Sequence, residues 1–193
     1  MVAKMAERMA VFFSKKEAYD YKEIKSYKYG FELLISTAMN FAGIILISYF
    51  TDTLLGAFLF LLAFIPIRLT AGGYHAKHHW SCILGFNFIY FISTMFIKSI
   101  NKDYITNVAL LSVILSSLMI IIFSPVESEN KLLSEKKWKK QRDISILIAS
   151  MNLALVLVSF YGTKTYVIQL GYYVSGSLMA SILLAVPFIV KKR

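Results

Sequence analysis

The chain has 193 residues, of which 58% are hydrophobic and only 17% are charged, and its formal net charge is +10. An average soluble domain has about 25% charged residues, so this composition argues against a soluble globular protein. The cations flank long apolar stretches, which indicates attraction to anionic lipid headgroups; we expect membrane lipids, and no nucleic acid, as partners.

Residues 1–30 are expected to form a cytoplasmic N-terminal region that begins with an amphipathic helix. The apolar run Met9–Phe13 is too short for a secretory signal peptide, which needs about 7–15 apolar residues. Apolar residues recur in this region at helical spacing, a pattern typical of a helix that lies on the membrane surface. A cytosolic helix packed on the rest of the protein would show the same pattern. Four apolar residues recur at helical spacing: Val2, Met5, Met9 and Phe12.

Long apolar stretches dominate the remainder of the chain, and a helix that spans a bilayer needs about 20 such residues. The second and third stretches are the shortest, so the main competing arrangement has four spans and a re-entrant or interfacial hairpin. We predict an all-α polytopic membrane protein with six transmembrane helices, forming one integral membrane domain over residues 1–193. The six stretches are Leu33–Phe50, Leu54–Ile67, Cys82–Ile97, Tyr104–Ser124, Ile144–Tyr161 and Tyr166–Val190.

Lysine and arginine are distributed unevenly between the two sides of this arrangement. Eighteen of the 21 lie in the N-terminal region, residues 68–82, residues 125–143 or the C-terminal tail. The other three loops contain only Lys98, Lys102 and Lys164. Because cytoplasmic loops carry the excess of lysine and arginine, both termini and both internal segments are predicted to be cytoplasmic.

The segment 68–82 is the most polar interruption in the first half of the chain. Gly72-Gly73 permits backbone conformations closed to other residues, so we expect a helix to end there. Cys82, the only cysteine, would then lie in the first turn of the next helix, with Ser81 as its N-cap, where the helix dipole favours a thiolate. With His75 it supplies the parts for nucleophilic catalysis. A lone membrane cysteine is, however, more often a small packing residue.

A metal site is the main alternative for the same segment. His75, His78 and His79 fall at i, i+3 and i+4, so one helical face could present them to zinc. The metalloprotease pattern is incomplete, because Ala76 stands where the glutamate base is needed. A metal-binding membrane transport or binding protein is therefore the alternative function.

Residues 125–143 are expected to form a basic cytoplasmic loop. Pro125 should end the fourth span, because proline cannot extend a hydrogen-bonded helix. The basic cluster is expected to anchor the topology, and a second role is electrostatic attraction of an acidic peptide. It consists of Lys136, Lys137, Lys139 and Lys140.

Two groups of residues form a recognisable pattern: Arg68, Ala71-Gly72-Gly73, His75-Ala76 and Cys82, and later Ser124-Pro125, Glu129-Asn130-Lys131 and Leu133-Ser134-Glu135. In this pattern the sequence resembles a known family, the accessory gene regulator B (AgrB-type) membrane cysteine peptidases. The resemblance covers most of the chain. Members often have a proline after the Asn-Lys pair, where this chain has Leu132.

The resemblance implies a function in quorum sensing at a bacterial cell membrane. Such proteins cleave the C-terminal part from a short precursor signalling peptide, hold the remainder as a thioester, and release a cyclic thiolactone or lactone, without a cofactor or metal. Cys82 would be the nucleophile and His75 the general base and then acid, on the cytoplasmic side. Arg68 would orient a carboxylate or carbonyl, and Gly73 would supply the backbone bend.

Two further expectations concern the surroundings of this site. Candidates for a third residue that orients His75 are Asn87, Glu127 and Glu129. A homodimer could form through the small residues of the last span, although the same face would equally suit packing within one subunit. These residues are Gly171, Ser175, Gly176 and Ser177.

Overall fold

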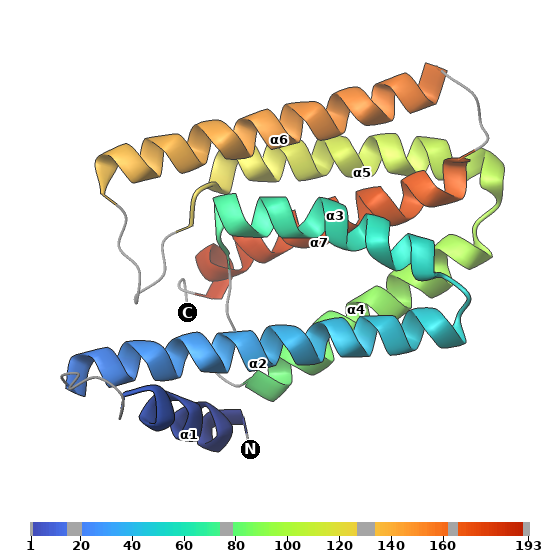
Figure 1. Ribbon diagram of the computed structural model, residues 1–193. Helices are drawn as coiled ribbons and strands as arrows, with labels where there is room; N and C mark the ends of the chain where they lie inside the picture. Colours follow the sequence, from blue (N-terminus) through green and yellow to red (C-terminus); the bar gives the residue numbers. More distant parts are fainter. Residues whose placement is uncertain (1, 15–20, 74–78, 127–133, 162–165, 191–193) are drawn as a thin grey trace. The chain divides into compact units, whose positions relative to one another are not determined.

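A computed structural model describes residues 2–14, 21–73, 79–126, 134–161 and 166–190 (Figure 1). Within these ranges the chain forms seven helices and no strand. It divides into two compact units, one made of residues 1–50 and 76–91 and the other of residues 51–75 and 92–193. Helix α4 passes from the first unit into the second.

Six of the helices are long and apolar enough to cross a bilayer, which confirms the all-α, six-span prediction and leaves the four-span alternative unsupported. The second and third spans are longer than predicted, because α3 has 18 residues and α4 has 21. The six helices are α2 (Tyr21–Phe50, with its span at Gly30–Phe50), α3 (Leu54–Ala71), α4 (His79–Ser99), α5 (Lys102–Phe123), α6 (Glu135–Tyr161) and α7 (Val167–Val190).

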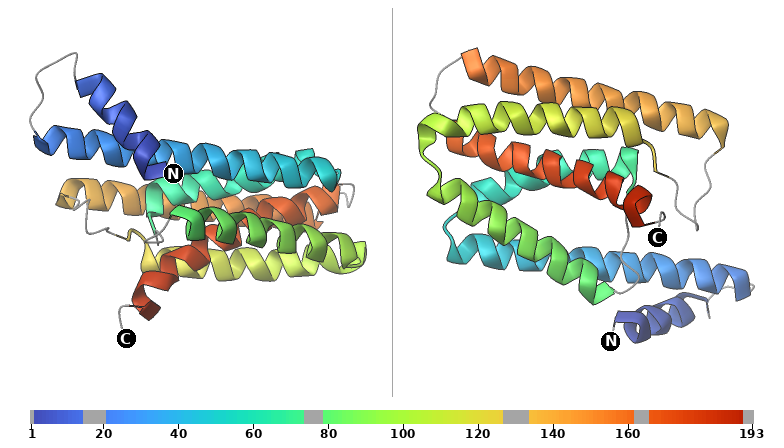
Figure 2. Two further views of the ribbon diagram at one scale, coloured as in Figure 1. Left: turned by 90° about the horizontal axis from the view of Figure 1, so that it is seen from below. Right: turned by 180° about the vertical axis from the view of Figure 1, so that it is seen from behind.

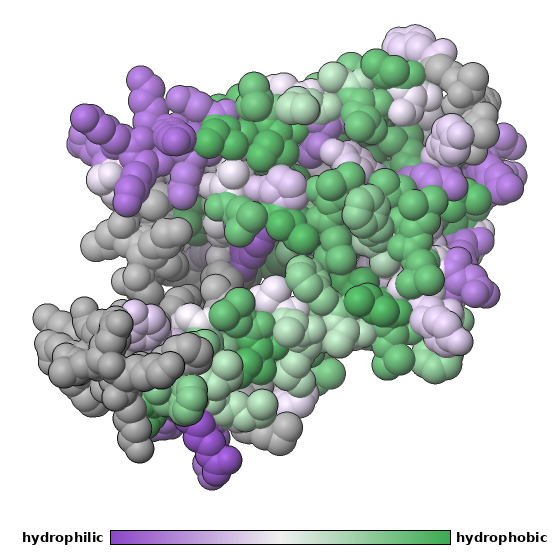
Figure 3. Space-filling model, in the orientation of Figure 1, coloured by the Kyte–Doolittle hydropathy of each residue, from purple (hydrophilic) through white to green (hydrophobic). Residues whose placement is uncertain are grey.

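Many large apolar side chains remain exposed on these spans. Phe58 and Leu69 of α3 are 62% and 73% exposed, and hydrophobic side chains cover much of the face in Figure 3. A surface of this kind would promote aggregation in water, whereas lipid tails provide it with apolar partners. The chain is therefore a multi-pass membrane protein.

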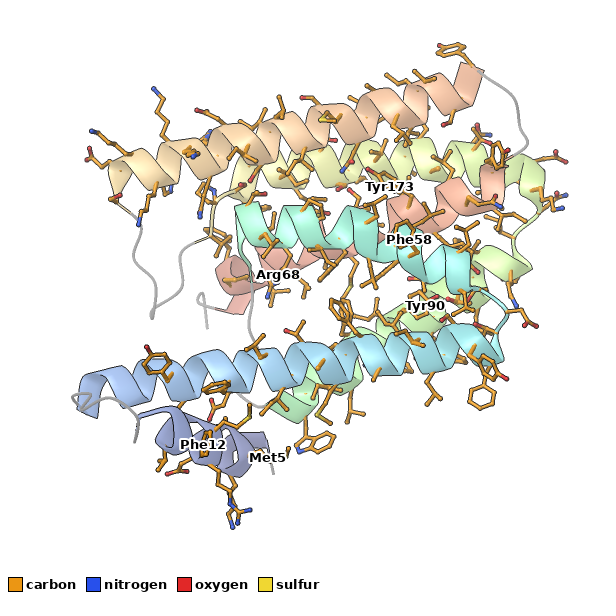
Figure 4. All side chains as sticks on the ribbon, in the orientation of Figure 1. Met5, Phe12, Phe58, Arg68, Tyr90 and Tyr173 are labelled. Carbon is orange, nitrogen blue, oxygen red and sulfur yellow. The ribbon has the colours of Figure 1, made fainter. Side chains whose placement is uncertain are left out.

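The first unit contains α1 (Val2–Ser14), which packs against α2. Ala6 and Ala10 are fully buried, and Glu7 forms an ion pair with Lys28 at 3.2 Å. The opposite face leaves apolar side chains exposed, among them the labelled Met5 and Phe12 (Figure 4). The amphipathic N-terminal helix is confirmed, and its exposed apolar face suits the predicted location on a membrane surface.

The second unit is built around α7, which contacts α3, α5 and α6 (Figures 1 and 2). Gly176 lets α7 approach α3, since a β-carbon at this position would collide with the carbonyl oxygen of Phe60. Between α5, α6 and α7 lies a small apolar core. Its buried members are Ala109, Val113, Val156, Leu170 and Val174.

A buried polar network joins the same three helices. The hydroxyl oxygens of Ser116 and Ser177 lie 2.8 Å apart, and Asn152 donates to the Ser177 hydroxyl at 3.4 Å. Tyr173 donates to the amide oxygen of Asn152 (Figure 4 labels Tyr173). Interhelical hydrogen bonds of this kind hold membrane helices together. Ser177 and Gly176 are thus used for packing within one subunit, which is the alternative that the sequence left open, and the homodimer stays a prediction.

Candidate functional site

Cys82 lies in the first turn of α4, as predicted, with a free thiol that is partly exposed. The start of a helix is a favourable place for an anion, because the positive end of the helix dipole lies there. Ser81 is not the N-cap, so that prediction was wrong. The helix already begins at His79, and the capping position falls outside the described residues.

The helix α3 ends at the predicted glycine pair. Gly72 has φ 75° and Gly73 has φ 120°, conformations that side-chain-bearing residues rarely adopt. A β-carbon on Gly72 would lie 2.5 Å from the carbonyl oxygen of Val126, and one on Gly73 would lie 3.0 Å from that of Leu183. Both glycines are therefore required by the turn and by close neighbours.

Arg68 caps this turn from within α3 (Figure 4). Its Nη1 donates a hydrogen bond to the carbonyl oxygen of Gly72 at 2.8 Å. A β-carbon on Gly73 would also collide with the same nitrogen. The guanidinium group, which was predicted to orient a substrate carbonyl or carboxylate, thus binds the carbonyl at the end of its own helix.

The backbone of Val126 binds the same turn, a contact that the sequence analysis did not anticipate. The N–H of Val126 donates to the carbonyl oxygen of Ala71 at 2.8 Å, and Val126 forms an isolated parallel bridge with Gly72. The helix α5 ends at Phe123, which confirms that Pro125 terminates the fourth span. Because this contact joins backbone groups, it depends on no particular side chain, and the sequence pattern does not reveal it.

The basic cluster lies on a helix rather than in a loop, so the prediction of a loop through residue 143 was wrong. The helix α6 begins at Glu135, and the four lysines are exposed on its first turns, where hydrophilic side chains gather in Figure 3. At about 100° per residue they occupy an arc of roughly 160°. Trp138 lies outside this arc and carries the guanidinium of Arg142 5.2 Å from its ring centre.

Several predicted site residues fall outside the described part of the chain. His75 and His78 do, as do Glu127 and Glu129, and the side chain of His79 is likewise not described. Among the side chains that the structure describes, no group of three His, Cys, Asp or Glu residues could hold a metal ion. The histidine alternative therefore stays untested.

Asn87, the remaining candidate for orienting His75, uses its amide nitrogen for contacts within the first unit, and its orienting role stays a prediction. Its Nδ2 donates to the carbonyl oxygen of Ile83 at 2.8 Å and approaches the Oδ1 of Asn40 at 3.4 Å. Gly43 allows this approach, because a β-carbon there would collide with the Asn87 amide. The amide thus joins α4 to α2 within the first unit.

A cavity of about 360 Å³ lies at the opposite end of α3 from Arg68. Gly56 and Tyr172 line it together with the charged side chains of Asp52, Lys98 and Lys102. None of its lining residues belongs to the segment 68–82, so it has no part in the candidate site.

Comparison with known proteins identifies the family. The model of the family described as accessory gene regulator B matches residues 6–186. The chain belongs to the accessory gene regulator B family. Membership connects it with accessory gene regulator processing in quorum sensing and agrees with its six apolar helices.

Named relatives in the accessory gene regulator B family resemble the chain over most of its length. A putative AgrB-like protein of Clostridium perfringens (strain SM101 / Type A) is 24% identical over 194 residues, covering 95% of this chain and 89% of that protein. The accessory gene regulator protein B of Staphylococcus aureus (strain bovine RF122 / ET3-1) is 23% identical over 161 residues, covering 80% and 83%. No solved structure matches.

Proposed function

We propose that this member of the accessory gene regulator B family is a membrane cysteine endopeptidase that cleaves a precursor signalling peptide and promotes its cyclisation. The observation that carries the proposal is the position of the only cysteine, Cys82, in the first turn of α4, shortly after the glycine turn, in a chain of this family. A partly exposed thiol at the start of a helix suits a nucleophile better than a buried packing residue.

The proposed reaction begins with proton transfer from the Cys82 thiol to His75. The thiolate attacks the carbonyl carbon at the cleavage site and the C–N bond breaks, while His75 returns the proton to the leaving amine. The N-terminal part of the peptide remains on Cys82 as a thioester. A thiol or hydroxyl of that peptide then attacks the thioester carbonyl, which releases Cys82 and closes a thiolactone or lactone ring.

Water competes with the second step, because hydrolysis of the thioester would give a linear product. A site at the boundary of the membrane limits access of water. Forming a thioester from an amide is uphill, so removal of the cleaved C-terminal fragment must pull the first step forward. The excess of cations in residues 68–82 and in the other predicted cytoplasmic segments supports a site on the cytoplasmic side.

The proposal is tested by co-expression with a short precursor peptide of an accessory gene regulator system, comparing wild type with Cys82→Ala. We expect cleavage of the precursor and a hydroxylamine-sensitive adduct, seen by intact mass, only when Cys82 is present. If the alanine variant cleaves the precursor at the wild-type rate, Cys82 is not the nucleophile and the proposal is wrong.

We further propose that the four exposed lysines of α6 attract an acidic part of the precursor. Replacing Lys136, Lys137, Lys139 and Lys140 by glutamine should raise the KM for cleavage about tenfold and leave kcat unchanged, since exposed ion pairs contribute roughly 0.2–1 kcal/mol each. The effect should shrink in high salt, which screens exposed charges.

Lys98→Gln with Lys102→Gln is the control, because it removes cations from the end of α4 and the start of α5. Steady-state cleavage of the purified precursor at two salt concentrations measures both variants. An unchanged KM in the fourfold variant would leave the lysines with topological anchoring as their only role.

A further inference from the structure

The glycine turn that precedes His75 in the sequence is held from three sides. The N–H of Val126 binds the carbonyl oxygen of Ala71 at 2.8 Å, and Arg68 binds that of Gly72, also at 2.8 Å. On the third side, Gly73 lies close enough to Leu183 of α7 that a β-carbon would come 3.0 Å from its carbonyl oxygen. These contacts form a backbone clamp, defined here as Ala71, Gly72 and Val126 with the Arg68 guanidinium.

The clamp holds the chain at Gly72, three residues before His75 in the sequence. The carbonyl groups at the end of a helix have no partner within it, and here two of them, those of Ala71 and Gly72, receive donors from outside the helical ladder. Only glycine fits at position 72, because φ is 75° and the carbonyl oxygen of Val126 occupies the space of a side chain. The backbone conformation at Gly72 is therefore set by Val126 as much as by α3.

We propose that Gly72 and the backbone N–H of Val126 are positioning groups for His75. This inference rests on the proposed function, because it needs His75 to act on the Cys82 thiol. In catalysis a displacement of about 1 Å can cost about 100-fold in rate, so a clamp three residues from the general base in the sequence matters even though none of its members reacts. It also makes the connection after α5 part of the active site's support.

Two substitutions test the clamp, each with a matched control. Gly72→Ala forces a β-carbon against the Val126 carbonyl, and Gly30→Ala makes the same change where no atom lies within 4 Å. Val126→Pro removes the N–H donor, and Val126→Ala retains it. We expect the two clamp variants to lose at least about tenfold in kcat with an unchanged KM, and the controls to keep wild-type kcat.

A second readout separates positioning from general damage. The rate of Cys82 alkylation by iodoacetamide is measured at pH 7 and pH 10 in wild type, His75→Ala and the four variants. If His75 activates the thiol, the loss of His75 lowers the alkylation rate at pH 7 relative to the rate at pH 10. The clamp variants should show the same lowered ratio of the pH 7 rate to the pH 10 rate. The rate at pH 10 should remain that of wild type, because the thiol itself is unaltered.

The outcomes distinguish the two proposals. If His75→Ala leaves the alkylation ratio of wild type unchanged, the Cys82–His75 pair of the proposed function fails. If His75→Ala lowers the ratio but Gly72→Ala and Val126→Pro do not, the pair stands and the clamp is overturned. The clamp is also overturned if a clamp variant loses peptide binding together with kcat. It is likewise overturned if one clamp variant no longer elutes as a single species in detergent while the other clamp variant cleaves the precursor normally.

Discussion

Replacing His75 by alanine is expected to lower precursor cleavage by at least about 100-fold, because general acid–base catalysis contributes roughly 10²–10⁴-fold. The same residue removes the thiol proton and protonates the leaving amine in the proposed reaction. The loss should therefore appear in kcat rather than in KM. Rates of cleavage by purified protein in vesicles, at saturating precursor, provide the measurement.

The double substitution His78→Ala with His79→Ala is the matched control for this result. It removes two imidazoles from the same segment and should leave cleavage within about threefold of wild type, since neither imidazole has a part in the acid–base step. A metal site would produce the opposite pattern. Loss of activity in the double variant, together with zinc that survives purification of the wild type, would favour the metal-binding alternative.

Gly176→Ala should destabilise the protein by about 1–3 kcal/mol, the usual cost of overpacking a well-packed core. A β-carbon at this position collides with the carbonyl oxygen of Phe60, and backbone cannot move aside as a flexible side chain can. The helices α3 and α7 would therefore have to move apart where they pack against each other. The expected effect is a fall in Tm of roughly 2–4 °C for each kcal/mol.

Gly85→Ala provides the comparison, because it is the same substitution within a helix where no atom lies within 4 Å of the added carbon. Alanine is favoured over glycine inside a helix by roughly 0.5–1 kcal/mol, so this variant should unfold at a slightly higher temperature than wild type. Thermal unfolding in one detergent measures both. Equal Tm values for the two variants would contradict the close approach of α7 to α3.

Local features of the sequence were sufficient for much of the fold. Six long apolar stretches predicted six spans, and Pro125 predicted the end of α5, because each depends on residues next to one another in the chain. The break after Ala71 was equally local, since two adjacent glycines lie there. In the candidate site, the place of Cys82 in a first turn followed from that break.

The remaining features were not predicted from the sequence for two reasons. Some depend on contacts between residues far apart in the chain, and others had a local signal that was misinterpreted. The hydrogen bond from Val126 to Ala71 joins backbone groups far apart in sequence. The helical start of α6 did leave a signal, because residues 135–143 contain no glycine or proline and are mostly good helix formers. Their charge favoured a loop in the sequence analysis. The Ser81 cap was wrong because the helix begins two residues earlier, at His79.

The continuity of the lysine-bearing turns with the span of α6 has a mechanical consequence. A helix of 27 residues extends about 40 Å, against roughly 30 Å of hydrocarbon, so one end must stand clear of the lipid tails. In a loop the height of these lysines above the bilayer would vary, whereas a helix continuous with the span holds each of them at a fixed height. In the proposed function, the acidic part of a precursor would therefore be bound at a fixed height above the hydrocarbon.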